Sequence, residues 1–147
     1  MKTFRIEQYI LVGLLGLLLA LAITVDYHRV VDYLFSDEVV YYMMAQTLAC
    51  DHDMAYARKD LERVYEEGWH AGPRGVYLTK AENGTIYYGK YLVYSLFLAP
   101  FIGLFGLKGF LILNVLLLWM MIWMGWVYLR QFNPHHLSLL IALTFFL

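Results

Sequence analysis

The chain has 147 residues, of which 61% are hydrophobic and 18% are aromatic, and its mean hydropathy is +0.56. A chain this apolar has too few polar side chains to cover a core in water, which excludes an ordinary soluble domain and predicts an integral membrane protein. Its net charge of -1 excludes the large basic surface typical of nucleic-acid-binding proteins, so we expect no nucleic acid among its partners.

The first apolar run extends from Gln8 to Val25 and contains no charged residue. About 18 helical residues, each rising 1.5 Å, nearly match a hydrocarbon core of roughly 30 Å, so this run is predicted to be the first membrane span. Lys2 and Arg5 before it would also suit a signal peptide, but no small-residue cleavage site follows.

Three further apolar runs follow a polar loop, namely residues 91–107, residues 109–129 and a run that begins at Leu137. We interpret them as a second span, a third span and the start of a fourth. Because a span cannot end halfway through a bilayer, we expect the sequence to be the amino-terminal part of a longer protein. The predicted domains are residues 1–25, the amino terminus and first span; residues 26–90, an extracytoplasmic loop; and residues 91–147, the later spans.

Positive charges near the spans predict the orientation of the chain. Lys2 and Arg5 favour a cytoplasmic amino terminus, because the cytoplasmic ends of membrane helices are enriched in Lys and Arg. The loop of residues 26–90 then faces the outside, with Lys108 inside and Arg130 outside.

The first half of the loop has the pattern of a helix that begins at Ser36. Ser36 suits the N-cap, and Asp37 and Glu38 fall in the first turn. The apolar residues of this segment recur at helical spacing and form one face, made of Val40, Met43, Met44, Thr47 and Leu48.

The second half of the loop predicts another helix and a β-hairpin. Mixed charges at three- and four-residue spacing indicate a helix over about residues 58–67, with Gly68 as its C-cap. Two β-prone segments, residues 76–79 and 85–88, flank Glu82-Asn83-Gly84, which is a hairpin signal. The predicted fold class is therefore an all-α polytopic membrane protein with a folded outer loop of two short helices and a hairpin.

Asp37 and Glu38 at the start of the first loop helix allow two interpretations. Acidic residues in a first turn stabilise a helix through its dipole, by about 0.3 to 1 kcal/mol each. A carboxylate held at a membrane surface can instead act as a general base, because an attacking hydroxyl or amine must lose a proton. Spacing alone does not distinguish the two.

The segment from Ser36 to Gln46, Ser-Asp-Glu-Val-Val-Tyr-Tyr-Met-Met-Ala-Gln, follows a single amino-terminal span. It resembles the opening of membrane glycosyltransferases of the GT-C fold, in the protein-mannosyltransferase-like and aminoarabinose-transferase-like branch. The resemblance implies that Asp37 is the catalytic acid, with Glu38 beside it. It also implies a multi-pass protein of a bacterial or archaeal cytoplasmic membrane.

The same family has a lysine near the end of this loop that meets the phosphate of a polyprenyl-phosphate sugar donor, and Lys90 stands at the matching position. The chain departs from the family after it, with Tyr91 and Leu92 where prolines are common, and the interval between the acidic pair and the lysine is longer. Tyr41 and Tyr94, from the same two motifs, are expected to contact substrate.

The leaving phosphate would need cations beside it, which Lys90 and Arg74 could supply. The structural alternatives are that Lys90 is an interfacial anchor and that Arg74 is an exposed turn residue. The expected donor is a polyprenyl-phosphate-linked sugar, the expected acceptor is a lipid, protein or glycan, and membrane lipids surround the spans.

Asp51-His52-Asp53 contains metal-ligand residue types, but residues this close on one turn rarely converge on an ion, so no metal site is assigned. Two other classes of function stay open. A transporter or flippase fragment would carry ionisable residues inside its spans, where Asn114 is the one strongly polar side chain. A non-catalytic membrane subunit would bind a partner through the loop and would not need Asp37.

Overall fold

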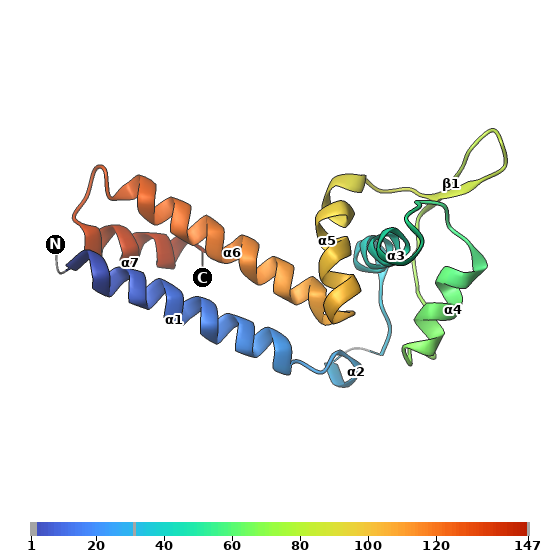
Figure 1. Ribbon diagram of the computed structural model, residues 1–147, viewed down its shortest axis with the longest axis horizontal. Helices are drawn as coiled ribbons and strands as arrows, with labels where there is room; N and C mark the ends of the chain where they lie inside the picture. Colours follow the sequence, from blue (N-terminus) through green and yellow to red (C-terminus); the bar gives the residue numbers. More distant parts are fainter. Residues whose placement is uncertain (1–2, 31, 147) are drawn as a thin grey trace. The chain divides into compact units, whose positions relative to one another are not determined.

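The computed structural model describes residues 3–30 and 32–146 (Figure 1). Lys2 and the side chain of Arg5, on which the predicted orientation depends, lie outside the described part. The chain is mostly helical and divides into two compact units. One unit contains the residues up to Thr24 and those from Leu111 onward, and the other runs from Val25 to Phe110.

The first unit is helical and apolar. It contains α1 (Thr3–Thr24), most of α6 (Lys108–Leu129) and α7 (His135–Phe146). Its buried core is made of Leu11, Ile122, Trp126, Leu139 and Ala142, and the indole Nε1 of Trp119 donates a hydrogen bond to the carbonyl of Leu11 at 2.8 Å.

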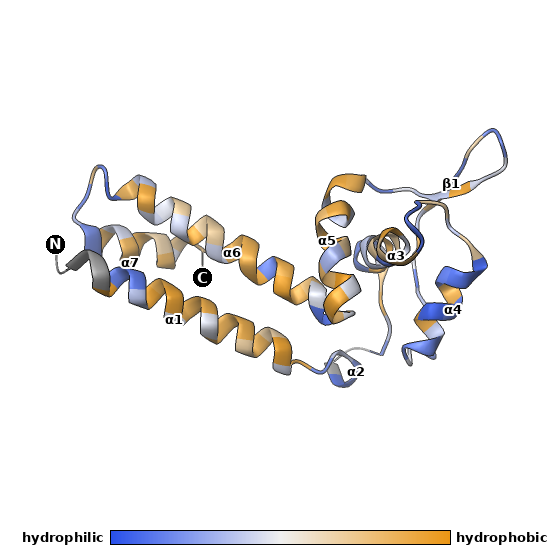
Figure 2. Cartoon of the chain, viewed as in Figure 1, coloured by the Kyte–Doolittle hydropathy of each residue, from blue (hydrophilic) through white to orange (hydrophobic). Residues whose placement is uncertain are grey.

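Within the described residues, α1 and α6 are each long and apolar enough to cross a membrane (Figure 2). Most of their residues are not buried by the protein. The predicted first and third spans therefore correspond to helices of suitable length. The predicted second span is realised as α5 (Leu92–Phe105), which has 14 residues. At 1.5 Å per residue, α5 rises about 21 Å, which is less than a hydrocarbon core of roughly 30 Å.

The second unit contains α2 (Tyr27–Val30), α3 (Ser36–Asp51), α4 (Arg58–Glu66), β1 (Leu78–Lys80), β2 (Ile86–Tyr88) and α5. The sequence pattern grouped α5 with the later spans, but in the structure its buried residues Ser95, Leu98 and Ile102 belong to the unit of the loop. The reason is that α5 packs against α3 along its length.

Helix α3 is the centre of this unit, because α5 and α4 both pack against it. The predicted apolar face is buried at Val40, Met43, Met44 and Thr47, and Leu48 is half-buried. The prediction of Ser36 as N-cap is wrong. The N-cap is Phe35, while Ser36 has a φ of +54° and its backbone N–H donates to the carbonyl of Arg74 at 2.8 Å.

Helix α4 ends one residue earlier than predicted, with Glu67 as its C-cap, and Gly68, the predicted C-cap, follows it. Gly68 has a φ of +91°, the left-handed conformation that glycine adopts without strain. The N–H groups of Gly68 and Trp69 donate to the carbonyls of Tyr65 and Val64, which is the Schellman arrangement. Trp69 and Val64 are both buried, so this helix end is also part of the core.

The predicted hairpin is also present, with strands shorter than expected. Leu78 pairs with Tyr88 and Lys80 with Ile86 in an antiparallel register. The turn closes through the Gly84 N–H, which donates to the Ala81 carbonyl at 2.9 Å, and Gly84 has a φ of +87°. A three-residue loop with glycine in the left-handed position is a common hairpin connection.

Candidate functional site at the start of helix α3

Two distant segments meet at the start of α3. The N–H of Arg74 donates to the carbonyl of Leu34 at 3.1 Å, and the Ser36 N–H donates to the carbonyl of Arg74. Gly75 follows with a φ of +72°, and an added Cβ there would lie 3.4 Å from the Cα of Ser36. The loop of residues 72–75 is therefore held against the residues that precede Asp37.

Asp37 and Lys90 form an ion pair. The Lys90 Nζ lies 2.7 Å from Oδ1 of Asp37, and the two side chains are 29% and 62% exposed. The hydrogen bond to Asp37 raises the pKa of Lys90 above its ordinary value, so the lysine stays protonated at neutral pH. Both predicted groups, the acid and the cation, are accessible to a ligand.

The hairpin positions Lys90. The N–H of Gly89 donates to the carbonyl of Tyr77 at 2.8 Å, and a Cβ on Gly89 would overlap the Tyr77 ring. Only glycine allows this close approach. The end of β2 thereby directs the next residue, Lys90, toward α3.

Glu38 is half-buried beside the ion pair, and burial raises its pKa. It lines an open pocket of about 360 Å³ together with Asp32, Tyr33 and Phe35. Burial, and then the charge of Glu38, raise the pKa of Tyr27 to about 12. The second acid of the pair therefore has a less polar environment than Asp37.

The predicted cation Arg74 contacts an aromatic residue of this pocket. Its guanidinium Cζ lies 4.1 Å from the ring centroid of Tyr33, one of the pocket residues. The side chain is exposed, as expected for a turn residue, and its charge interacts with an aromatic face. Arg74 thus lies at the same end of α3 as Glu38.

The two tyrosines predicted to contact substrate pack against each other. Their rings meet edge to face with centroids 5.2 Å apart, and the Ser95 hydroxyl donates to the Tyr41 carbonyl at 3.2 Å. Tyr94 also contacts the ring of Phe110 at 5.8 Å. Tyr41 on α3 and Tyr94 on α5 are both half-buried, so their contact joins the two helices.

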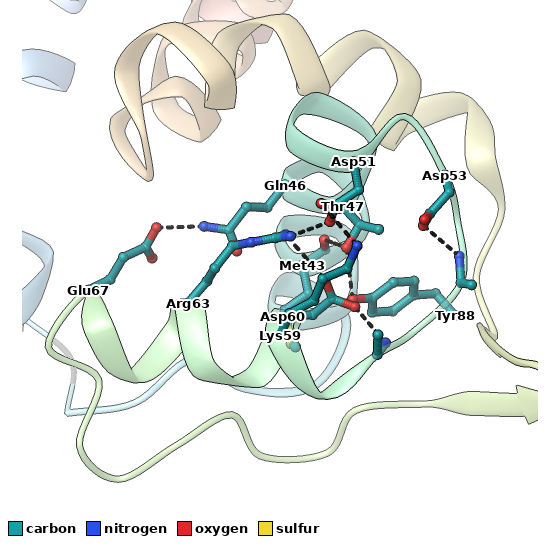
Figure 3. A network of polar contacts seen from close by, with 12 residues as sticks. Met43, Gln46, Thr47, Asp51, Asp53, Lys59, Asp60, Arg63, Glu67 and Tyr88 are labelled. Carbon is teal, nitrogen blue, oxygen red and sulfur yellow. Dashed lines mark hydrogen bonds and ion pairs between the residues drawn. The ribbon is translucent and has the colours of Figure 1, made fainter.

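A polar network between α3 and α4 was not predicted (Figure 3). The hydroxyl of Tyr42 and the amide Nε2 of Gln46 donate to the carboxylate of Glu67 at 2.6–2.7 Å. Tyr42 and Gln46 are one helical turn apart, which is a signal that they share a face. Their partner Glu67 lies beyond the end of α4, and no local pattern identifies it.

The acidic residues around His52 take part in structural contacts. Asp51 pairs with Lys59 at 3.0 Å and with Arg63. Burial acts to raise the pKa of Asp51, but the hydrogen bonds and charges of Arg63 and Lys59 together outweigh it, so the pKa is lowered. The carboxylate of Asp53 accepts the N–H of Ala55 at 3.1 Å. Asp51 therefore ties the end of α3 to α4.

The stability of the loop unit is expected to decrease as the pH rises, because of Glu67. Burial raises the pKa of this carboxyl from its ordinary value of 4.5, against the opposing effects of Tyr42, Gln46, His28 and Arg63. The folded unit therefore binds the proton more tightly than the unfolded chain does. The resulting stabilisation is complete below pH 4.5, the ordinary pKa of the carboxyl, and it is lost as the pH rises through the raised pKa of Glu67 in the folded state.

The measurement is the unfolding temperature of the full chain between pH 4 and pH 8, compared with Glu67→Gln. We expect the variant to show a weaker pH dependence, whereas the control Glu66→Gln, on an exposed residue of α4, should keep the wild-type slope. Equal slopes in wild type and Glu67→Gln would contradict this assignment.

Comparisons with protein-family models, with curated proteins and with solved structures found no match.

Proposed function

We propose that this chain belongs to a membrane glycosyltransferase that moves a sugar from a polyprenyl-phosphate carrier to a lipid, protein or glycan acceptor. The observation that carries the proposal is the 2.7 Å pair of Asp37 and Lys90. These are the two residues that the family resemblance assigns to acid and phosphate-binding roles, and they come from opposite ends of the loop.

The pair suits such a transfer chemically. A lipid-linked sugar leaves its phosphate as the acceptor attacks the anomeric carbon, and the phosphate gains negative charge. A protonated Lys90 can stabilise that charge. When a donor phosphate binds Lys90, the ion pair between Lys90 and Asp37 is broken. The Asp37 carboxylate can then accept the proton of the acceptor. Attack opposite to the leaving phosphate would invert the anomeric centre.

Glu38 and Arg74 extend this site. Glu38 lines a pocket of about 360 Å³, which has the size of a small-molecule site, and Arg74 contacts the Tyr33 ring, which also lines it. Burial raises the pKa of Glu38, and in its protonated form this carboxyl would donate a hydrogen bond to a sugar or phosphate oxygen. The Arg74 guanidinium, over Tyr33, offers a second cation for phosphate.

The proposal includes a membrane location with several crossings. Helices α1 and α7 begin at the same end of their unit, because Glu7 and His136, each near the start of its helix, line one pocket (Figure 1). Only residues 130–134 link α6 to α7, so α6 runs opposite to α1. We therefore place Lys108 on the side of the loop and Arg130 on the side of the amino terminus, the reverse of the positions expected when residues 91–107 are counted as a span.

In this topology α5 stays with the loop outside the membrane core and does not cross it. Its 14 residues are too few for a straight crossing, and its buried face packs on α3. Its exposed apolar residues, Val93, Leu96, Phe97 and Leu104, would meet the lipid surface. The site at the start of α3 would then lie near the membrane surface, where a polyprenyl phosphate presents its headgroup.

The test is sugar transfer from a labelled polyprenyl-phosphate donor pool in membranes that carry the full-length protein. Wild type should transfer, and Lys90→Met should transfer roughly 100-fold less, because the leaving phosphate loses a preorganised cation. The control Lys80→Met removes an exposed lysine of β1 and should transfer normally. No transfer by wild type would contradict the proposal, and full activity of Lys90→Met would favour a non-catalytic subunit.

A further inference from the structure

The unit of α1, α6 and α7 contains a buried carboxylate that the proposed reaction does not use. Glu7, near the start of α1, is only 4% exposed. Its Oε2 is buried and has no hydrogen-bond partner among the residues that the structure describes. Because a buried charge is costly unless it is paired, this oxygen calls for a proton donor or a cation from elsewhere.

A pocket of about 310 Å³ adjoins this carboxylate between α1 and α7. Glu7 and His136 are its polar lining residues, and the remainder of the wall is aliphatic, made of Ile6, Ile10, Leu139, Leu140 and Leu143. Glu7 is the fifth residue of α1 and His136 is the second residue of α7, and the two helices begin at the same end of their unit (Figure 1). The two polar lining residues therefore both lie near helix starts, and most of the aliphatic lining residues follow them along the chain.

We propose that this pocket binds a membrane phospholipid with a primary ammonium headgroup, of the phosphatidylethanolamine class. The ammonium donates to the free oxygen of Glu7, which supplies the missing partner. The imidazole of His136 can donate to the headgroup phosphate, and an acyl chain lies along Ile10, Leu139 and Leu143.

The shape and the charge of the pocket together favour a lipid over a water-soluble amine. A soluble amine would satisfy Glu7 but would leave the aliphatic wall uncovered, whereas a lipid covers both. A choline headgroup is a poorer partner than ethanolamine, because its three methyl groups replace every N–H donor. The inference depends on the membrane location of α1 and does not depend on glycosyl transfer.

The experiment measures lipid retention by the purified full-length protein. The protein is incubated with an equimolar mixture of phosphatidylethanolamine, phosphatidylcholine and phosphatidylglycerol with identical acyl chains, and the lipids retained are counted by native mass spectrometry. We expect wild type to retain the ethanolamine lipid at least about tenfold more than the choline lipid, as the loss of a charged hydrogen bond implies. Glu7→Gln should reduce this preference toward unity, while the control Glu66→Gln, on exposed α4, should keep it.

Equal retention of the ethanolamine and choline lipids by wild type would overturn the proposal, and this comparison needs no variant to fold. A preference for phosphatidylglycerol would also overturn it. An ethanolamine preference that persists in a folded Glu7→Gln protein would show that Glu7 does not bind the ammonium group, which contradicts the proposal. Because the readout is bound lipid, a negative result here is distinguishable from a failure of the transfer assay.

Discussion

Replacing Asp37 with asparagine is expected to lower sugar transfer at least about 100-fold, since an amide cannot take the proton of an attacking acceptor. The substitution is nearly isosteric, and the side chain is 62% exposed and pairs with a lysine that is itself partly exposed. Exposed ion pairs contribute little to folding, so the unfolding temperature should change little. Activity and stability should therefore separate in this variant.

The assay is the same transfer from labelled donor, at matched expression and with insertion of the protein verified. Asp53→Asn is the matched control, because Asp53 is exposed and its Oδ1 accepts the Ala55 N–H, a bond that asparagine can also accept. Full transfer by Asp37→Asn would assign the residue to stabilisation of the α3 dipole and would contradict its catalytic role.

Replacing Asp60 with alanine is expected to destabilise the loop unit by about 3 kcal/mol, because it breaks a buried charge pair. Asp60 is fully buried. One carboxylate oxygen accepts the N–H of Ala57 at 2.7 Å and caps α4, and the other lies 3.2 Å from Nη1 of Arg63. The variant leaves both partners without this acceptor and opens space in the core.

The control for this change is Glu62→Ala in the same helix. Glu62 pairs with Arg58, but the two side chains are 56% and 90% exposed, so its loss should change stability by at most about 0.5 kcal/mol. The measurement is thermal unfolding of the full chain, in which protease cleavage within residues 25–110 reports the unfolding of the loop unit. Similar unfolding temperatures for the two variants would show that the Asp60 contacts are not stabilising.

Local patterns predicted the helix after Phe35, the charged helix α4 and the hairpin, because each depends on neighbours within a few residues. Helix α4 is amphipathic and ends at a glycine in the left-handed conformation, and the hairpin follows from Asn83-Gly84. Glycine conformations and i,i+4 contacts are local, so the sequence contains the information directly.

The apolar run that forms α5 shows where such reasoning was limited. Hydropathy measures how readily a segment leaves water, and it does not identify what covers the segment. Leu98 and Ile102 are buried against protein in the same helix that exposes Phe97 and Leu104. Only the packing of α5 on α3 shows that a protein partner, rather than lipid alone, covers one of its faces.

The apolar class of α1 and α6 and the glycines of the α4 end and the hairpin turn were determined by the sequence itself, since they arise from local conformational preferences and from transfer out of water. The tertiary structure alone decided that Lys90 meets Asp37, that Glu67 closes the contact between α3 and α4, and that Glu7 is buried. These contacts join residues far apart in the chain. Their geometry depends on how whole helices pack, which no short window of sequence contains.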